Sequence, residues 1–219
     1  MERTIRVTGR GRISLKPDMM RLIIKISEVH KDYQETIEAS SERTQTLREA
    51  LGNAGFDPKD LKTLFFSVDV ENEGYYDKNN NWKQKFAGYR FTHNLRISFD
   101  LDNGKLGKAL YQLAKCGVNA EISIGYTVKD PDAAKDLLLE SAVKDSTNKA
   151  STLAKASGVE LGRVVSIDYS WGELDIYGRA VDDMKIGGMA FSKTMSIDMD
   201  IEADDIDVTD TVTIVWEIQ

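Results

Sequence analysis

The stretch GRGRISLKPD, residues 9–18, follows a strand-like run, TIRVT, and opens with two glycines on either side of Arg10. A dinucleotide-binding loop needs a third glycine three residues later and a helix directly behind it. Position 14 is Ser14, and the chain continues into another strand-like run. The Gly-Lys-Ser/Thr of a Walker loop does not occur in the sequence either. We therefore expect the two glycines to relieve crowding in a bent or bulged strand, and Pro17 and Asp18 to turn the chain into the next strand.

Strand and helix patterns alternate along the rest of the chain. Apolar and polar residues alternate, as in half-buried strands, over 4–15, 19–29, 61–76, 82–101, 120–128, 164–169 and 211–218. Apolar residues recur at steps of three and four, as on one face of a helix, over about 32–54, 106–113 and 130–156. Asp32 and Asp130 precede the two long helices as capping acids, and a glycine follows each helix. This order of elements predicts an α+β fold.

The predicted fold is a twisted, mainly antiparallel sheet made of strand-helix-strand units, with two long helices and one short helix packed on it. The strands at 61–76 and 82–101 exceed the usual length of about 5–6 residues, so we expect a long hairpin that protrudes from the body. The last strand returns to the sheet after a long connection. This predicts a single domain over 1–219, with 172–205 an irregular acidic insertion before the last strand.

Length and composition exclude several classes of protein. With 219 residues and 41% hydrophobic positions, the chain is long enough to bury a sizeable core. Its longest apolar runs, such as 22–24 and 137–139, are far too short to span a bilayer, so we expect no integral membrane segment. A single cysteine, Cys116, excludes an intramolecular disulfide and a cysteine-rich metal site.

The first residues differ from a secretory leader, because strand-like alternation begins at once and no apolar core of a leader follows. We therefore expect a cytoplasmic protein. The alternative is an exported protein whose leader has been removed.

The net charge of −7 is unevenly distributed. Ten acids stand against three bases within 174–210, whereas the first 21 residues carry a net charge of +4. The basic residues Arg6, Arg10 and Arg12 lie on one face of the first strand. An isoelectric point near 5.0 and the lack of interleaved aromatic residues argue against nucleic acid as their partner. We expect these arginines to pair with the acidic segment, within the chain or across subunits, through candidates that include Asp198, Asp200, Glu202 and Asp204.

No catalytic residue, cofactor site or metal site is predicted. The two histidines, His30 and His93, lie on different strands, and neither belongs to a ligand-spaced cluster. Spacing alone leaves a dyad with a serine or cysteine open, although ordinary histidines of a sheet are the stronger expectation. The acidic run DMDIEADDIDVTD, residues 198–210, lacks the glycine and the twelfth-position glutamate of an EF-hand. We interpret it as the solvated face of a strand, with loose cation binding as the alternative.

Four aromatic residues lie on the predicted hairpin: Tyr75, Tyr76, Trp82 and Phe86. Cross-strand packing is the simplest explanation for them. A projecting hairpin that carries aromatic side chains is also suited to contacts between subunits. These four residues are therefore our candidates for an oligomer interface.

Five motifs follow one another along the chain: IRVTGRGRISLKPD, DLKTLFFSVD, GYRFTHNLRISFD, AVKDSTNKASTLAKASG and LGRVVSI. Together they resemble the SIMPL domain family, a bacterial family of largely unknown function that includes a periplasmic immunogenic protein. The resemblance covers about 5–167, and VTDTVTIVWEI resembles the closing strand of the family, so that only 172–205 is left out.

The resemblance implies an α+β domain of strand-helix-strand units. It also implies homo-oligomers, including ring or channel-like assemblies in some members, and links to oxidative-stress tolerance. The family supplies no agreed catalytic residues, so none is transferred to this chain. Many members carry an export leader, which the first residues here do not show.

From these patterns we expect a non-enzymatic, self-assembling protein, related to stress tolerance, that forms homo-oligomers through the long hairpin and the acidic segment. The alternative is a small-molecule or metal-ion binding module that uses the acidic residues 198–210 or a cleft between a helix and the sheet. A third hypothesis, a hydrolase, needs a nucleophile and a base side by side, which the sequence does not display.

Overall fold

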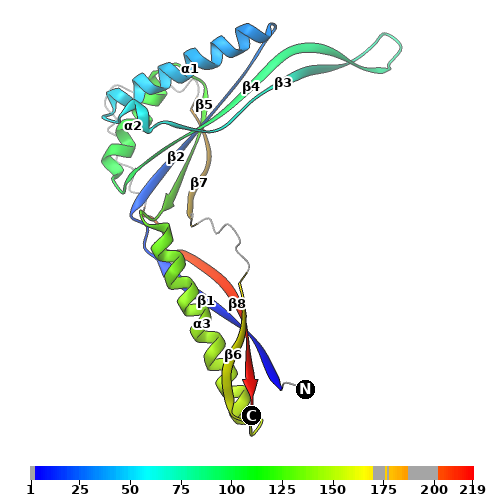
Figure 1. The fold of residues 1–219 in the computed structure, drawn as a ribbon. Helices are drawn as coiled ribbons and strands as arrows, with labels where there is room; N and C mark the ends of the chain where they lie inside the picture. Colours follow the sequence, from blue (N-terminus) through cyan, green and yellow to red (C-terminus); the bar gives the residue numbers. More distant parts are fainter. Residues whose placement is uncertain (1–2, 170–175, 177, 187–201) are drawn as a thin grey trace. The chain divides into compact units, whose positions relative to one another are not determined.

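The computed structural model describes residues 3–169, 176, 178–186 and 202–219. These residues form eight strands, three α-helices and one 3₁₀ helix (Figure 1). In chain order the elements are β1 (Thr4–Leu15), β2 (Met19–His30), α1 (Tyr33–Asn53), η1 (Pro58–Asp60), β3 (Lys62–Tyr76), β4 (Trp82–Asp100), α2 (Asn103–Lys115), β5 (Ala120–Thr127), α3 (Pro131–Ala156), β6 (Leu161–Asp168), β7 (Gly178–Ile186) and β8 (Ile206–Ile218).

The chain divides into two compact units. The first, which we call the three-stranded unit, contains residues 1–18, 127–178 and 203–219. The second, the five-stranded unit, contains 19–126 and 179–202. Neither unit is a continuous half of the sequence, and the single domain over 1–219 stays a prediction.

In the three-stranded unit the strand order is β1-β8-β6, and both strand pairs are antiparallel. Helix α3 packs on this sheet, and its small residues Ala142 and Ala150 meet the larger side chains of the strands. The buried strand residues of this core are Val7, Val212, Ile214 and Trp216. Asp130 caps the helix as predicted, because its side chain accepts a hydrogen bond from the Ala133 N–H at 3.0 Å.

Gly9 and Gly11 lie where α3 crosses β1. A Cβ atom on Gly9 would lie 2.1 Å from the carbonyl oxygen of Ala142, and one on Gly11 would lie 2.2 Å from that of Leu138. The register between β1 and β8 runs through both glycines without a shift, so a bulge at these positions is wrong, whereas a bend of the strand stays a prediction. The glycines instead allow the backbone of α3 to lie directly on the strand, because any side chain there would collide with it.

Side chains of α3 also bind the backbone of β1, which is an outer strand of its sheet. The N–H of Arg10 donates to Asp145 Oδ2 at 2.7 Å, and the N–H of Arg12 donates to Ser141 Oγ at 3.4 Å. A helix that covers an outer strand in this way protects it from pairing with another chain.

In the five-stranded unit the strand order is β3-β4-β2-β5-β7, and β4 pairs antiparallel with both β2 and β3. Helix α1 packs on β2 and β4 and contacts α2. Asp32 begins α1 as predicted, since its side chain accepts from the N–H groups of Gln34 and Glu35 at 2.8 and 3.2 Å. The core of this unit contains Leu22, Ile24 and Ile26 of β2, Leu95 and Ile97 of β4, Leu47 and Leu51 of α1, and Leu106 and Leu113 of α2.

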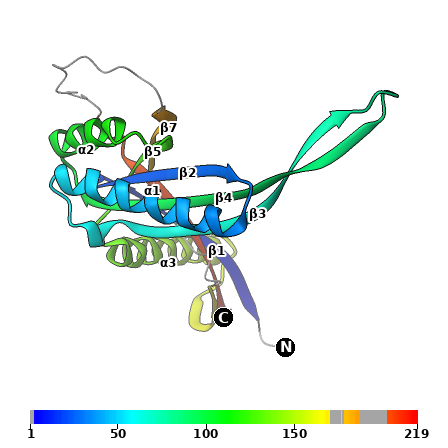
Figure 2. The ribbon, with the colours of Figure 1, turned by 90° about the horizontal axis from the view of Figure 1, so that it is seen from above.

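Strands β3 and β4, of 15 and 19 residues, form the predicted long hairpin. Strand β2 pairs with β4 only as far as His30, which lies opposite Tyr89. Among the described strands, β4 pairs with β3 alone from there to the turn at 77–81, and Figure 2 shows the hairpin extending past the end of α1. A bulge lies beside Gly88, whose φ is 152°, because Glu71 pairs with Gly88 and the next residue, Asn72, pairs with Phe86.

The predicted α+β class and mainly antiparallel pairing are confirmed, and the strands divide between two sheets. Part of the predicted irregular insertion, 172–205, is a strand, β7, and most of the remainder lies outside the described residues. In the described part of the chain, no helix combines the length and the apolar character needed to cross a bilayer.

Candidate functional site

The hairpin beyond its last pair with β2, residues 71–88, is called the arm below. Residues opposite each other in an antiparallel pair share a face, and faces alternate along each strand. Tyr76 lies opposite Trp82, and Phe86 lies four residues further along β4 on the same face. Tyr75 is next to Tyr76 and therefore lies on the other face. The structure brings three of the four candidate aromatics together and separates Tyr75 from them.

Aromatic and aliphatic side chains line one face of the arm and its base. The Tyr76 and Trp82 rings meet edge to face, with their centres 5.0 Å apart, yet stay 64% and 59% exposed. A Cβ on Gly74 would lie 2.1 Å from the Trp82 ring, so the indole lies flat across the glycine. The Phe86 ring lies 5.2 Å from that of Tyr89. The exposed apolar residues of this face form the apolar strip: Val70, Tyr76, Trp82 and Phe86.

The opposite face of the arm carries charge pairs. Arg90 donates to both carboxylate oxygens of Glu71, at 2.8 and 3.0 Å, and these hydrogen bonds lower the pKa of Glu71. The ammonium of Lys85 lies 3.0 Å from Glu73 and 6.0 Å from the centre of the Tyr75 ring. The arm is therefore amphipathic, with one apolar and one charged face.

Asp77 holds the turn at the tip of the arm. Its carboxylate accepts from the N–H groups of Asn79 and Asn81 at 2.8 and 3.0 Å, and Lys83 lies 3.0 Å away. These contacts lower the pKa of Asp77, the hydrogen bond from Asn81 most of all. Asn80 has the left-handed φ of 61° that this residue type tolerates in turns. The two strands therefore leave the turn in a defined register.

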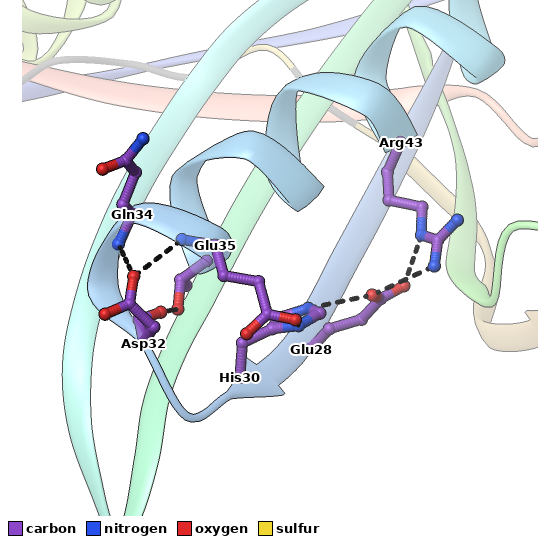
Figure 3. A network of polar contacts seen from close by, with 7 residues as sticks. Glu28, His30, Asp32, Gln34, Glu35 and Arg43 are labelled. Carbon is purple, nitrogen blue, oxygen red and sulfur yellow. Dashed lines mark hydrogen bonds and ion pairs between the residues drawn. The ribbon is translucent and has the colours of Figure 1, made fainter.

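A network of charged side chains lies where the arm leaves the sheet (Figure 3). Arg43 of α1 donates to both carboxylate oxygens of Glu28 of β2, at 2.8 and 3.4 Å, and this raises the pKa of Arg43. The imidazole of His30 lies between two carboxylates, with Nε2 3.4 Å from Glu28 and Nδ1 3.5 Å from Glu35. The His30 carbonyl lies so close to Gly88 that a Cβ there would be 2.2 Å away. The network thus ties the end of β2 to the first turns of α1 beside the base of the arm.

A pocket of about 450 Å³ lies between α1 and the outer strand β3. Its central residue is His93, which is buried; Nδ1 lies 3.1 Å from Thr44 Oγ1, and Nε2 lies 2.8 Å from Thr63 Oγ1. The Phe66 ring meets the imidazole edge to face at 5.1 Å. Burial lowers the pKa of His93, and the positive charge of Arg48 lowers it further. The neutral imidazole is therefore favoured at pH 7.

The hydrogen bonds of Thr44 decide which nitrogen of His93 carries the proton. Thr44 Oγ1 donates to the carbonyl oxygen of Ser40 at 2.8 Å, so toward His93 Nδ1 it acts as the acceptor. In a neutral imidazole Nε2 is then an acceptor. The Thr63 hydroxyl therefore donates to Nε2.

The sequence patterns did not predict this pocket, because its residues come from α1, β3 and β4. One signal was present in the sequence. Thr36, Ser40 and Thr44 recur at steps of four on the inward face of α1, where apolar residues are the rule. Hydroxyl groups repeated on a buried face indicate a polar partner on the opposite element.

The candidate arginines lie on the exposed face of β1, as predicted from the alternation. Arg6 lies 3.7 Å from Asp168 of β6, outside the acidic segment. The candidates Asp198 and Asp200 lie outside the described residues, whereas Glu202 and Asp204 are described and exposed. The pairing of the arginines with the acidic segment stays a prediction.

A metal site would need several ligating side chains close together. Within residues 3–169, 176, 178–186 and 202–219, no three His, Cys, Asp or Glu side chains form a group that could hold a metal ion.

Comparison with known proteins matches residues 5–216 to the family model SIMPL, described as a protein of unknown function (DUF541). The 26 kDa periplasmic immunogenic protein of Brucella abortus is 32% identical over 166 residues, which cover 74% of this chain and 65% of that protein. The uncharacterized protein YggE of Edwardsiella ictaluri is 25% identical over 163 residues, 74% of this chain and 66% of the relative. YggE of Escherichia coli is 26% identical, with 74% and 63% covered. The match thus spans just under two thirds of the length of these curated relatives.

Proposed function

This chain belongs to the SIMPL family of proteins of unknown function, and we propose that it is a self-assembling protein whose arm joins it to further copies of itself. The apolar strip is the observation that carries this proposal. Val70, Tyr76, Trp82 and Phe86 are 57%, 64%, 59% and 48% exposed, and all lie on one face. Exposed apolar and aromatic side chains that share one face of a projecting element, here together with Asn72 and Gln84, are typical of a protein contact surface.

The outer strand β3 supports the same proposal. It lies at the edge of its sheet, and three consecutive apolar residues, Leu64, Phe65 and Phe66, are 47%, 51% and 43% exposed. A long outer strand with exposed apolar side chains is a template for pairing with another chain. The outer strand β1 differs, since side chains of α3 bind its backbone.

The test is the mass of the protein in solution, measured by light scattering after gel filtration. We expect the wild-type chain to be an oligomer and the double variant Tyr76→Ser/Trp82→Ser to dissociate at the same concentration. Tyr75→Ser is the matched control, because Tyr75 is the neighbouring aromatic on the charged face and its loss should leave the mass unchanged. A wild-type chain that is monomeric at every concentration would refute the proposal.

A non-enzymatic role and an exported location complete the proposal. The names of the relatives describe an immunogenic protein and uncharacterized proteins, without an activity. The Brucella relative is named as periplasmic, which supports the exported alternative over the cytoplasmic one. Fractionation of the source cells would decide between the two locations. The relation to stress tolerance stays a prediction.

A second candidate function is the binding of a small molecule in a cleft between a helix and the sheet. The pocket beside His93 favours it, because α1 supplies one wall and β3 the other. For the metal-ion form of this alternative, no described group of residues offers support.

A further inference from the structure

The pocket beside His93 is built from polar groups in a place where the rest of the unit is apolar. Five described polar side chains are buried in the whole chain, and three of them, Thr36, Ser40 and His93, lie at this end of α1. One turn further along, the same helix buries Leu47 and Leu51. Buried hydroxyl and imidazole groups are costly unless they are hydrogen-bonded, and those around His93 bond to one another and to the helix backbone. This end of α1 therefore gives the pocket a polar wall.

A bulge in β3 contributes to this site. The register between β3 and β4 shifts between Thr63 and Phe65, so that Leu64 is an extra residue. A bulge changes the direction of neighbouring side chains, and bulges are common beside functional sites. Here the Thr63 hydroxyl reaches Nε2 of His93 at 2.8 Å, and Phe66 forms the adjacent wall of the pocket.

The charge of the pocket is positive. Among the described residues that line it, Arg48 is the one with a full charge, and no acidic side chain lines it. The Nη1 atom of Arg48 donates to the carbonyl oxygen of Pro58 at 2.9 Å, which holds the guanidinium in place. A guanidinium has five N–H donors, so Arg48 keeps donors for a ligand. The apolar part of the lining consists of Ile37 and Phe66, which are 36% and 43% exposed.

We propose that this pocket binds a small organic carboxylate, whose negative group pairs with Arg48 and whose apolar part lies against Ile37 and Phe66. A volume of about 450 Å³ falls in the range of small-ligand sites, which is roughly 300–1,000 Å³. Guanidinium and carboxylate form short, charge-assisted hydrogen bonds. The imidazole N–H and the Thr63 hydroxyl proton already have partners, so Arg48 supplies the donors for the carboxylate. This inference rests on the second candidate function and specifies its ligand class.

The test uses three probes of nearly the same shape and different charge: benzoate, benzamide and benzylamine. The readout is the imidazole NMR signals of the full chain, which has only two histidines, so that His30 serves as an internal reference. We expect benzoate to shift the His93 signal in a saturable manner and to leave His30 unchanged. Benzamide and benzylamine should bind at least about tenfold more weakly, because they lack the charge-assisted contact.

Two variants locate the charge that is responsible. Arg48→Gln should weaken benzoate binding by about tenfold or more. Lys108→Gln, which removes one positive charge from the exposed face of α2, should leave it unchanged. Loss of the Arg48 charge itself alters the surroundings of His93, so a His30 signal and a urea-unfolding midpoint like those of the wild type would show that both variants are folded.

Each other outcome overturns the inference in a distinguishable way. If benzamide or benzylamine binds as well as benzoate, the pocket takes small molecules but does not select a carboxylate. The inference then fails, whereas the second candidate function remains supported. If inorganic phosphate shifts His93 and benzoate does not, the ligand class is wrong. If no probe shifts His93, both the inference and the second candidate function fail. The mass measurement of the Tyr76→Ser/Trp82→Ser variant is independent of all these results.

Discussion

Helix α3, which lies far along the chain, leaves no room for a side chain at Gly9 or Gly11. Without the position of α3, the pair indicates only local freedom of a strand, which explains why the contact with the helix was not predicted. The capping residues Asp32 and Asp130 were predicted correctly, because each acts on residues next to it in sequence. At the scale of single residues, local effects are thus predictable and distant contacts are not.

The close approach at Gly9 leads to a stability prediction. Gly9→Ala should lower the free energy of unfolding by about 3 kcal/mol or more, since the new Cβ would lie 2.1 Å from a helix carbonyl oxygen. Gly52→Ala is the control, because nothing lies within 4 Å of its Cβ position in α1. That change should be neutral or stabilise by up to about 1 kcal/mol. Urea unfolding measures both, and equal effects would contradict the packing of α3 on β1.

The burial of His93 leads to a pH prediction. Its pKa in the folded chain lies below the ordinary value of 6.5, so the unfolded chain binds the proton first as the pH falls. The neutral imidazole contributes fully to the free energy of unfolding above pH 6.5, and this contribution is lost as the pH falls through the lower pKa of the folded state. One proton corresponds to at most about 1.4 kcal/mol per pH unit. His93→Gln should reduce the slope of the unfolding free energy against pH in this range. In the control His30→Gln, the portion of that slope that comes from His93 should remain.

At the scale of elements, the residues that end helices allowed the boundaries of helices to be predicted best. The expected helix at 130–156 corresponds to α3, Pro131–Ala156, because a capping acid and a following glycine mark its ends. Helix α2 is longer than the predicted 106–113, since Asp102 caps it earlier by accepting from the Lys105 N–H at 2.9 Å. Strand β8 begins at Ile206 rather than 211, so its first residues lie in the acidic run that was interpreted as the solvated face of a strand.

The arm leads to a prediction for hydrogen exchange. In the five-stranded unit β4 lies between β2 and β3 as far as Tyr89, whereas in the arm it pairs with β3 alone among the described strands. Amide groups of 71–88 should therefore exchange faster than those of 91–99 in a dilute sample. At assembling concentrations the arm amides should become protected in the wild type. They should stay fast in Tyr76→Ser/Trp82→Ser, and protection of the arm in that variant would contradict an interface on the apolar strip.

For the whole molecule, the sequence did not reveal which strands pair with each other. Alternation of apolar and polar residues shows that 206–218 contains a strand, but it does not say which strand will pair with it. The structure pairs β8 with β1 and β6, so the strands form two sheets where one was expected. The pocket beside His93 was missed for the same reason, since its walls come from three elements that only the fold brings together.

The opposite charges of the two ends of the chain lead to a prediction at this scale. If the arginines of β1 pair with the acidic segment, stability or assembly should weaken as salt rises. The triple variant Arg6→Gln/Arg10→Gln/Arg12→Gln should lose this salt dependence. The control replaces Lys115, Lys144 and Lys155 by glutamine, which removes the same charge from other exposed positions. Equal salt dependence in wild type and triple variant would refute the pairing, and thermal unfolding with light scattering measures both properties.

The register between β1 and β8 has a consequence for the order in which the protein takes shape during synthesis. Thr4 pairs with Glu217 and Leu15 with Ile206, so β1 has no partner until the chain has been made as far as β8. Residues 19–126, in contrast, hold most of the five-stranded unit in one continuous piece. As the chain leaves the ribosome, that piece can fold while β1 still lacks its partner. A ribosome that stops before residue 206 therefore releases a chain with a folded middle and an unpaired first strand.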